Sequence, residues 1–190
     1  PRSTPKPSSA ASDVYKRQVF EPPDLKEWPD IEFELGEEVK RVNMDSLSSA
    51  EIQSWKSGDT LLLSGKMLTG RDAAHKKIVD MIESGQELPV DFTNRLIYYV
   101  GPVDPVKDEV VGPAGPTTAT MMDKFTRTML EKTGLAGMIG KAERGPVAID
   151  AIRDNKAVSM IAVGGAAYLV AKAITGSTDN SPKLLRRYVD

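Results

Sequence analysis

Short apolar runs and longer amphipathic stretches alternate along most of the chain. The apolar runs predict strands at residues 37–44, 60–64, 95–101, 136–141 and 157–165. Stretches with apolar positions three and four residues apart predict helices at residues 71–83, 117–134, 145–156 and 166–174. This order predicts an α/β domain, a layered sheet with helices, in which at least some strands pair in parallel.

The composition narrows the class of protein. The 190 residues suffice for one domain with a core, and mixed acidic and basic positions with a formal net charge of -2 exclude a basic nucleic-acid surface. The absence of cysteine excludes disulfides, thiolate metal sites and cysteine nucleophiles. The longest nearly apolar run, residues 160–171, is too short to cross a membrane. We therefore expect a soluble, cytoplasmic protein that binds neither nucleic acid nor membrane.

Both ends of the sequence are polar and lack periodicity. Residues 1–18 are rich in Pro, Ser and Lys, and such a composition cannot bury enough surface to offset the entropy of the chain. We predict a disordered or non-native leader at 1–18, one folded domain at 19–176 and a disordered or foreign tail at 177–190.

Four junctions between a predicted strand and a predicted helix carry small or polar residues: 69–72, 112–118, 140–146 and 163–167. Helix beginnings expose N–H groups and the positive end of the helix dipole, so several of them at one sheet edge form a site for anions. The glycines at 163–167 allow a phosphate loop as a second interpretation, but they lack the full dinucleotide-binding fingerprint.

Arg71 and His75 are the most informative polar residues. On a helical wheel Arg71 falls on the apolar face of its helix, and a buried arginine needs an anionic partner. Arg71 therefore forms an internal ion pair, or reaches the surface, or binds a ligand carboxylate through two hydrogen bonds. His75, the single histidine, is interpreted as a hydrogen-bonded core residue or as an acid or base.

Thr117, Thr118 and Lys141 are further candidates. The two threonines directly precede a predicted helix, where they either cap it or present hydroxyl and N–H groups to an acidic ligand. Lys141 lies between a predicted strand and a predicted helix. It is either a solvated lysine or the charge partner of a second carboxylate.

Four motifs closely resemble the C-terminal domain of class I, iron–sulfur-dependent fumarate hydratases: SGKMLTGRDAAHKKIVDMIESGQELPVDF, LIYYVGPV, VVGPAGPTTATMMDKFTRTMLEKTGLAGMIGKAERGP and SMIAVGGAAYLVAKAI. Two-subunit fumarases and L-tartrate dehydratases carry the same domain as a β subunit. The resemblance runs from about Glu21 to Ile174. Within it, GPTTATxMDKFT, in which x is Met121, and GKAERGP fit the single-chain fumarases better than the tartrate enzymes.

The resemblance implies a swivelling β/β/α domain that closes over a cluster-bearing N-terminal domain or α subunit. That partner would hold a [4Fe-4S] cluster on three cysteines, and this chain would bind no cofactor itself. The implied reaction is the hydration of fumarate to L-malate in the tricarboxylic acid cycle, by a full enzyme that is a homodimer. The sequence departs from the family after Ile174, so we interpret it as a fragment that is inactive alone. The alternatives are an L-tartrate dehydratase β-type subunit and a catalytically dead homologue that serves in binding or assembly.

The matched motifs also imply residue roles. Arg71 would clamp a dicarboxylate substrate, Thr117, Thr118 and Lys141 would contact it, and Thr117 would be the general base for the C3 proton. His75 belongs to a matched motif without an implied role. Met121 stands where the family has an arginine that binds a substrate carboxylate, and methionine has no donor for an oxyanion. Losing one such charge-assisted contact would reduce the free energy of substrate binding by about 1.5–3 kcal/mol.

Overall fold

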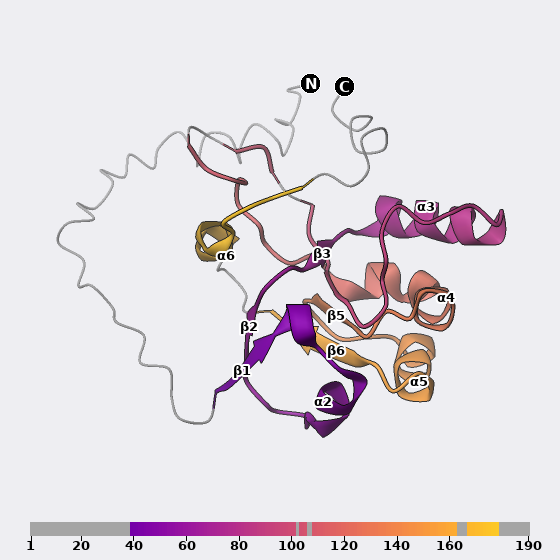
Figure 1. Cartoon of the computed structure of the whole chain (residues 1–190). Helices are drawn as coiled ribbons and strands as arrows, with labels where there is room; N and C mark the ends of the chain where they lie inside the picture. The colour runs from indigo at the N-terminus through magenta and orange to yellow at the C-terminus, as the bar shows by residue number, and fades with distance from the viewer. Residues whose placement is uncertain (1–38, 102, 106–107, 163–166, 179–190) are drawn as a thin grey trace, which may run out of the picture. The chain divides into compact units, whose positions relative to one another are not determined.

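The computed structural model describes residues 39–101, 103–105, 108–162 and 167–178, which all belong to one compact unit, Glu38–Asp190. The predicted leader, most of the predicted tail and most of the glycine junction at 163–167 lie outside the described residues. The described elements are, in order, β1 (Lys40–Asn43), η2 (Met44–Ser46), α2 (Ser49–Ser54), β2 (Leu61–Ser64), β3 (Leu68–Thr69), α3 (Asp72–Glu83), β4 (Leu96–Tyr98), η3 (Ala119–Met122), α4 (Asp123–Thr133), β5 (Gly137–Gly140), α5 (Pro146–Asp154), β6 (Val158–Ile161) and α6 (Ala167–Ala173) (Figure 1).

A parallel sheet of four strands, in the order β3-β4-β5-β6, forms the centre of this unit. Its two inner strands, β4 and β5, are buried on both faces, which explains their continuous apolar sequences. Successive strands are neighbours in the sheet, and parallel crossovers are right-handed. The connecting helices α3, α4 and α5 therefore lie together on one face (Figure 1).

Alternate residues of β4 contribute to two cores on opposite faces of this sheet. Ile97 belongs to the core beneath α3, α4 and α5, together with the fully buried Met129 of α4. Leu96 and Tyr98 belong to the other core, which β1, α2 and α6 cover with Val42, Ile52 and Ala171. Strands β1 and β2 pair in a separate two-stranded parallel sheet. The layers therefore follow the order small sheet, large sheet, and the helices α3, α4 and α5.

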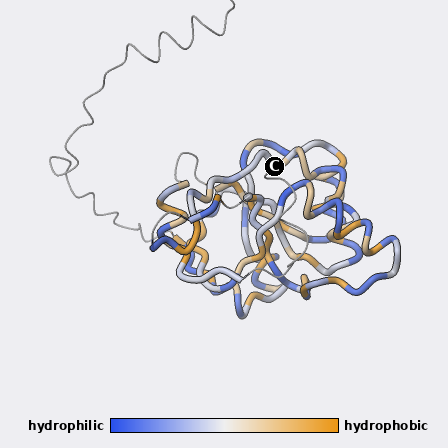
Figure 2. The backbone as a smooth tube through the Cα atoms, turned by 90° about the horizontal axis from the view of Figure 1, so that it is seen from above, coloured by the Kyte–Doolittle hydropathy of each residue, from blue (hydrophilic) through white to orange (hydrophobic). Residues whose placement is uncertain are grey.

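These layers confirm the predicted α/β class. Hydrophobic and hydrophilic segments alternate along the backbone of the described part (Figure 2). None of the helices in this part is long and apolar enough to cross a membrane.

Several predicted helix boundaries are also confirmed. Pro146 occupies the first turn of α5, and Gly134 ends α4 in the left-handed conformation, with φ 71°. The predicted helix at 117–134 is wrong at its beginning, because a 3-10 turn precedes α4, which starts only at Asp123. The prediction also missed α2 and β3, which are too short to show a period.

Candidate functional site

The carboxyl ends of β3, β4, β5 and β6 meet at one side of the central sheet, which we call the carboxyl edge. Arg71 follows β3 at this edge, and Lys141 follows β5. The backbone N–H of Gly70 still donates to the carbonyl of Tyr98, over 3.1 Å, so the sheet pairing continues as far as the residue before Arg71.

The segment Thr117–Ala119 inserts between the ends of β4 and β5 at this edge. The N–H of Thr117 donates to the carbonyl of Tyr99 over 2.6 Å, and the N–H of Lys141 donates to the carbonyl of Thr117 over 3.1 Å. Thr118 also forms an isolated parallel bridge with Lys141. A side chain at Gly140 would prevent this insertion, because its Cβ would lie 2.9 Å from Cδ2 of Tyr99. Two of the predicted sites, far apart in sequence, are therefore direct backbone neighbours.

The exposure and the backbone conformation of Arg71 differ from those predicted for it. Its backbone is extended (φ -131°, ψ -156°) because it caps α3 from outside, so the helical wheel does not apply to it. The side chain is 56% exposed, and its ion pair with Asp72 is long, at 3.8 Å. The predicted burial and internal ion pair are therefore wrong. The guanidinium instead lies over Gly101 just beyond β4, where an added Cβ would be 3.0 Å from Cζ of Arg71.

The other candidates also occupy the carboxyl edge. Thr118 stands at the start of the 3-10 turn, but within the described structure its side chain makes no capping hydrogen bond, so the capping interpretation is wrong for this residue. Both threonines are half-buried, and Lys141 is exposed. Met121 is 51% exposed in the same turn. The edge thus combines two exposed cations, two hydroxyl residues and the beginnings of α3 and α5, an arrangement suited to an anion.

His75 lies inside the helix layer rather than at the edge. It is 1% exposed, and its Nδ1 lies 2.8 Å from the carbonyl oxygen of Arg71. Its ring makes an edge contact with Tyr99 and stacks near Phe125. Burial lowers the pKa of His75 and raises that of Tyr99. The core interpretation of this histidine is confirmed, although its Nε2 finds no hydrogen-bond partner in the described part of the chain.

A buried charged pair, Arg144 with Asp123, lies beneath the edge and was missed by the sequence analysis. The side chain of Arg144 is 6% exposed, and its Nε donates to Oδ1 of Asp123 over 2.7 Å. Both residues belong to motifs quoted above, yet neither falls on an apolar stripe. Asp123 opens α4, where a carboxylate can accept from N–H groups of another segment, but the predicted helix at 117–134 placed this residue in its interior.

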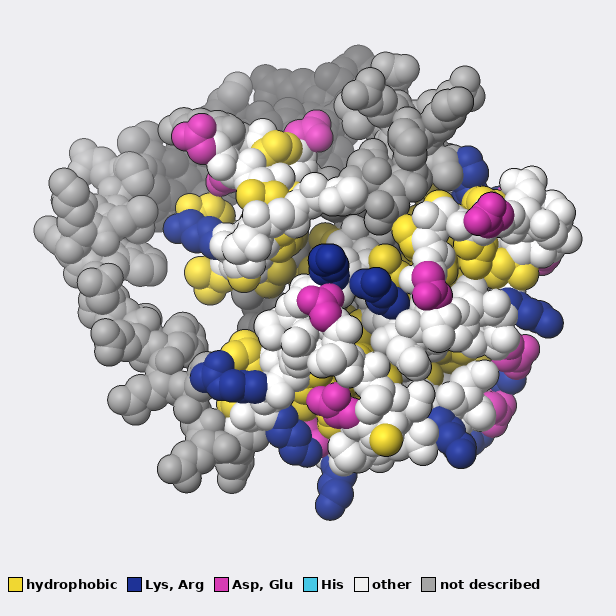
Figure 3. Space-filling model, viewed as in Figure 1, with side chains coloured by type: hydrophobic (Ala, Val, Ile, Leu, Met, Phe, Trp, Pro, Cys, Tyr) yellow, Lys and Arg dark blue, Asp and Glu magenta, His cyan; other side chains and the backbone are white. Residues whose placement is uncertain are grey.

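Charges elsewhere on the surface are mixed. On the face seen in Figure 3, Lys and Arg side chains are interspersed with Asp and Glu and form no continuous basic patch among the described residues. In the same part of the chain, no group of three or more His, Cys, Asp or Glu could hold a metal ion.

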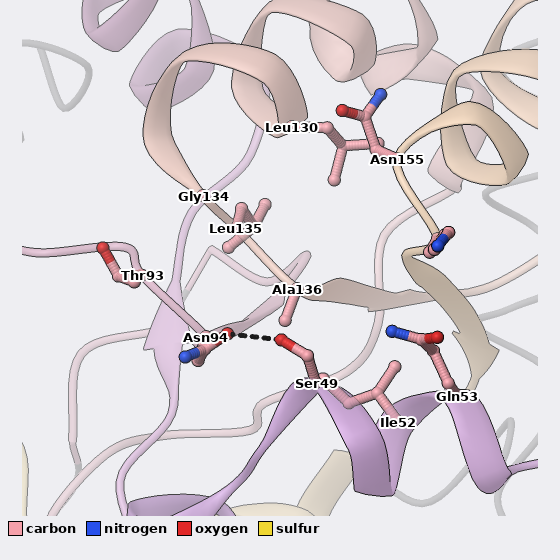
Figure 4. Close-up of a pocket in the computed structure, with 11 residues that line it drawn as sticks. Ser49, Ile52, Gln53, Thr93, Asn94, Leu130, Gly134, Leu135, Ala136 and Asn155 are labelled. Carbon is pink, nitrogen blue, oxygen red and sulfur yellow. Dashed lines mark hydrogen bonds between the residues drawn. The ribbon is translucent and has the colours of Figure 1, made fainter.

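A cavity of about 290 Å³ opens at the opposite side of the sheet, before the strands begin. Asn94 precedes β4 in its wall, Ala136 precedes β5, and Gly134 and Asn155 follow α4 and α5 (Figure 4). The hydroxyl of Ser49 on α2 donates to Oδ1 of Asn94 over 3.2 Å across this wall. None of the candidate site residues lines this cavity, so it is separate from the carboxyl edge.

Fold and edge together define an α/β domain that gathers cations, hydroxyl residues and helix beginnings at the ends of parallel strands. The family model described as Fumarase C-terminus matches residues 15–179, and the chain belongs to this family. The resemblance noted in the sequence is thereby confirmed, and the chain is a member of a hydro-lyase family.

Curated relatives agree with this assignment. The chain is 32% identical over 132 residues to the "Putative L(+)-tartrate dehydratase subunit beta" of Methanocaldococcus jannaschii, covering 68% of each chain. It is 33% identical over 132 residues to the "Putative fumarate hydratase class I" of Geobacillus stearothermophilus, covering 67% of this chain but 24% of that protein. It is 28% identical over 139 residues to the "L(+)-tartrate dehydratase subunit beta" of Escherichia coli, covering 72% of this chain and 67% of the relative.

Proposed function

We propose that this chain supplies substrate-carboxylate binding and proton transfer to a hydro-lyase that interconverts fumarate and L-malate. The observation that supports the proposal is that Arg71, Thr117 and Lys141, from three separate strand-to-helix junctions, all lie at the carboxyl edge. Membership of the Fumarase C-terminus family gives the reaction class.

The proposed chemistry divides the substrate between the two cations. A guanidinium matches a carboxylate with two parallel hydrogen bonds, so Arg71 takes one carboxylate and Lys141 acts as a point charge for the other. Removal of the C3 proton from malate places extra negative charge on a carboxylate, and fixed cations and N–H groups aimed there lower the barrier. Thr117 accepts that proton. A neutral hydroxyl is a poor base, so Thr117 would accept the proton as its alkoxide, whose negative charge the neighbouring cation Lys141 would stabilise.

The hydroxide half of the reaction is assigned to a partner. The chain contains no cysteine, so its residues do not fit a [4Fe-4S] cluster. Two of the relatives are named as β subunits, which supports a separate α subunit or a preceding domain as the cluster-bearing partner. Closure of that partner over the carboxyl edge would exclude water from the substrate.

Met121 limits the number of cations available to the substrate. It is exposed in the turn before α4, and its thioether cannot donate a hydrogen bond to a carboxylate. The proposed site therefore relies on Arg71 and Lys141 alone for full positive charges among the candidate residues.

L(+)-tartrate is the second candidate substrate, because the relatives from Methanocaldococcus jannaschii and Escherichia coli are both named for it. Tartrate is also a four-carbon dicarboxylate, so the same two cations would bind it. The two substrates differ at a middle carbon, where L-tartrate carries a hydroxyl and L-malate a hydrogen. The two cations bind the carboxylates and would not distinguish this difference.

A binding experiment tests the site without the partner. The full chain is titrated with L-malate, fumarate and L-tartrate by NMR, together with Arg71→Ala, Lys141→Ala and the control Lys76→Ala. Lys76 is an exposed cation within α3, so its loss changes the net charge equally. Arg71→Ala and Lys141→Ala should each weaken malate binding on the order of 10- to 100-fold, and the control should bind as the parent does.

The same titration can refute the proposal. If the parent chain binds none of the three diacids, or if all four proteins bind equally, the carboxyl edge is not a dicarboxylate site. A catalytically dead assembly module would give the first result. Tighter binding of L-tartrate than of L-malate would favour the tartrate dehydratase alternative.

A further inference from the structure

We infer that Arg144 and Asp123 form a buried clamp that positions Lys141 beside Thr117. The two are positioning residues: they act on the proposed dicarboxylate site through the backbone and touch no substrate themselves. The effect on binding rests on the proposed function, whereas the clamp itself rests on hydrogen bonds between Arg144, Gly145 and α4.

The guanidinium of Arg144 makes hydrogen bonds to two residues of α4. Its Nε donates to Oδ1 of Asp123 over 2.7 Å, and its Nη2 donates to Oγ1 of Thr126 over 2.6 Å. It also lies 5.7 Å from the ring centroid of Tyr99, the residue that follows β4. Because the side chain is almost fully buried, these contacts hold Arg144 in one place and keep it from a ligand at the surface.

The second carboxylate oxygen of Asp123 holds the backbone of the same loop. Oδ2 accepts the N–H of Gly145 over 2.6 Å, so one carboxylate at the start of α4 binds both a side chain and a main-chain donor of the segment before α5. A side chain at position 145 would not fit here, because its Cβ would lie 2.8 Å from this oxygen. The clamp therefore fixes the carboxyl end of the loop 141–145 to α4.

The amino end of that loop is bonded to the Thr117 segment by its backbone. Besides the bond from Lys141 to Thr117, the N–H of Ala119 donates to the carbonyl of Lys141 over 2.9 Å. Between the two fixed ends Ala142 has φ 64°, a left-handed conformation that is unfavourable for alanine. Such a conformation persists only where the surroundings determine it. Releasing the clamp at Arg144 should therefore let Ala142 relax and move Lys141 away from Thr117.

Stability alone does not account for this pair. The desolvation penalty of burying two charges offsets much of the free energy of their attraction. Proteins in which apolar residues replace a buried ion pair are often at least as stable. What the pair adds is geometry, because it joins α4 to the loop after β5 at the point where the proposed site residues meet.

The experiment uses the full chain and compares hydrogen exchange with ligand binding. Arg144→Lys keeps the charge but cannot reach Asp123 and Thr126 together. Thr126→Val removes the hydroxyl that accepts from Arg144, whereas Thr126→Ser keeps it. Arg127→Lys is the control, since Arg127 pairs with Asp154 from the exposed side of the same helix. For each protein we would measure amide exchange at Ala119 and Lys141, relative to β4, and the Kd for L-malate.

Arg144→Lys should speed exchange at Ala119 and Lys141, relative to β4, on the order of tenfold and should raise the Kd for L-malate similarly. Thr126→Val should give a smaller change in the same direction, and Thr126→Ser and Arg127→Lys should match the parent. Unchanged exchange in Arg144→Lys, or equal acceleration of the β4 amides, would overturn the clamp. If the parent binds no malate, the proposed function fails, and the exchange comparison still decides the clamp.

Discussion

Acidification should destabilise this protein through one buried side chain. His75 is the single histidine of the chain and is almost completely buried. Burial is the largest cause that lowers its pKa below the ordinary value of 6.5, and the charge of Arg144 acts in the same direction. The hydrogen bond with the Arg71 carbonyl and the charge of Asp72 oppose the shift only in part.

The sign of the effect follows from where the proton binds. The unfolded chain protonates this imidazole near 6.5, whereas the folded chain keeps it neutral to a lower pH. Between those two values the unfolded state binds more protons, so the free energy of unfolding decreases as the pH falls. Since a single proton is involved, the slope cannot exceed about 1.4 kcal/mol per pH unit. Above 6.5 the contribution of His75 is fully present and independent of pH.

Urea denaturation at a series of pH values from about 7.5 to about 5.5 measures this slope, since carboxylates ordinarily titrate below that window. His75→Asn is the matched control, because its amide keeps a donor near the position of Nδ1 and does not titrate. The parent should lose stability below 6.5, and the variant should start less stable but show a flat profile. Parallel profiles for the two proteins would refute the assignment of the buried, neutral imidazole.

Two further predictions concern packing, and chemical denaturation measures both. Met122→Ala should lower the free energy of unfolding by about 2–5 kcal/mol because Met122 is fully buried, whereas Met121→Ala, at the exposed neighbour, should change it by less than about 0.5 kcal/mol. Equal effects would contradict the orientation of the turn before α4. Gly140→Ala should destabilise by about 1–3 kcal/mol, because its Cβ would meet Tyr99 at 2.9 Å and Ala119 at 3.1 Å. The control Gly176→Ala meets no atom within 4 Å, and a neutral Gly140→Ala would argue against the insertion of Thr117 between β4 and β5.

The sequence was sufficient to predict most of the fold because the main elements have clear periods. Ile78 and Met129 lie on the apolar faces of long helices, and the run at β4 is apolar throughout, as a strand buried on both sides requires. The six-residue α2 and the two-residue β3 could not be predicted in this way, since neither is long enough for a period to repeat.

The candidate site was predictable only in part. Parallel strands bring their following residues to one edge, so the proximity of Lys141 to the Thr117 junction follows from the α/β order. The position of Arg71 does not, because a helical wheel treats it as part of α3 although its backbone is extended. The pair of Arg144 and Asp123 depends on how α4 and the loop before α5 meet, and no local pattern encodes that contact.

The insertion of Thr117 between the ends of β4 and β5 bears on how the protein folds. The pairing partners of Thr117, Tyr99 and Lys141, belong to two other segments of the chain, so these contacts are non-local and form only after the intervening loops have closed. The rim should therefore be assembled only in the fully folded molecule. By mass action, a ligand held there would raise the melting temperature of the entire unit, and a lesion as remote as α2 would weaken ligand affinity by depleting the folded population.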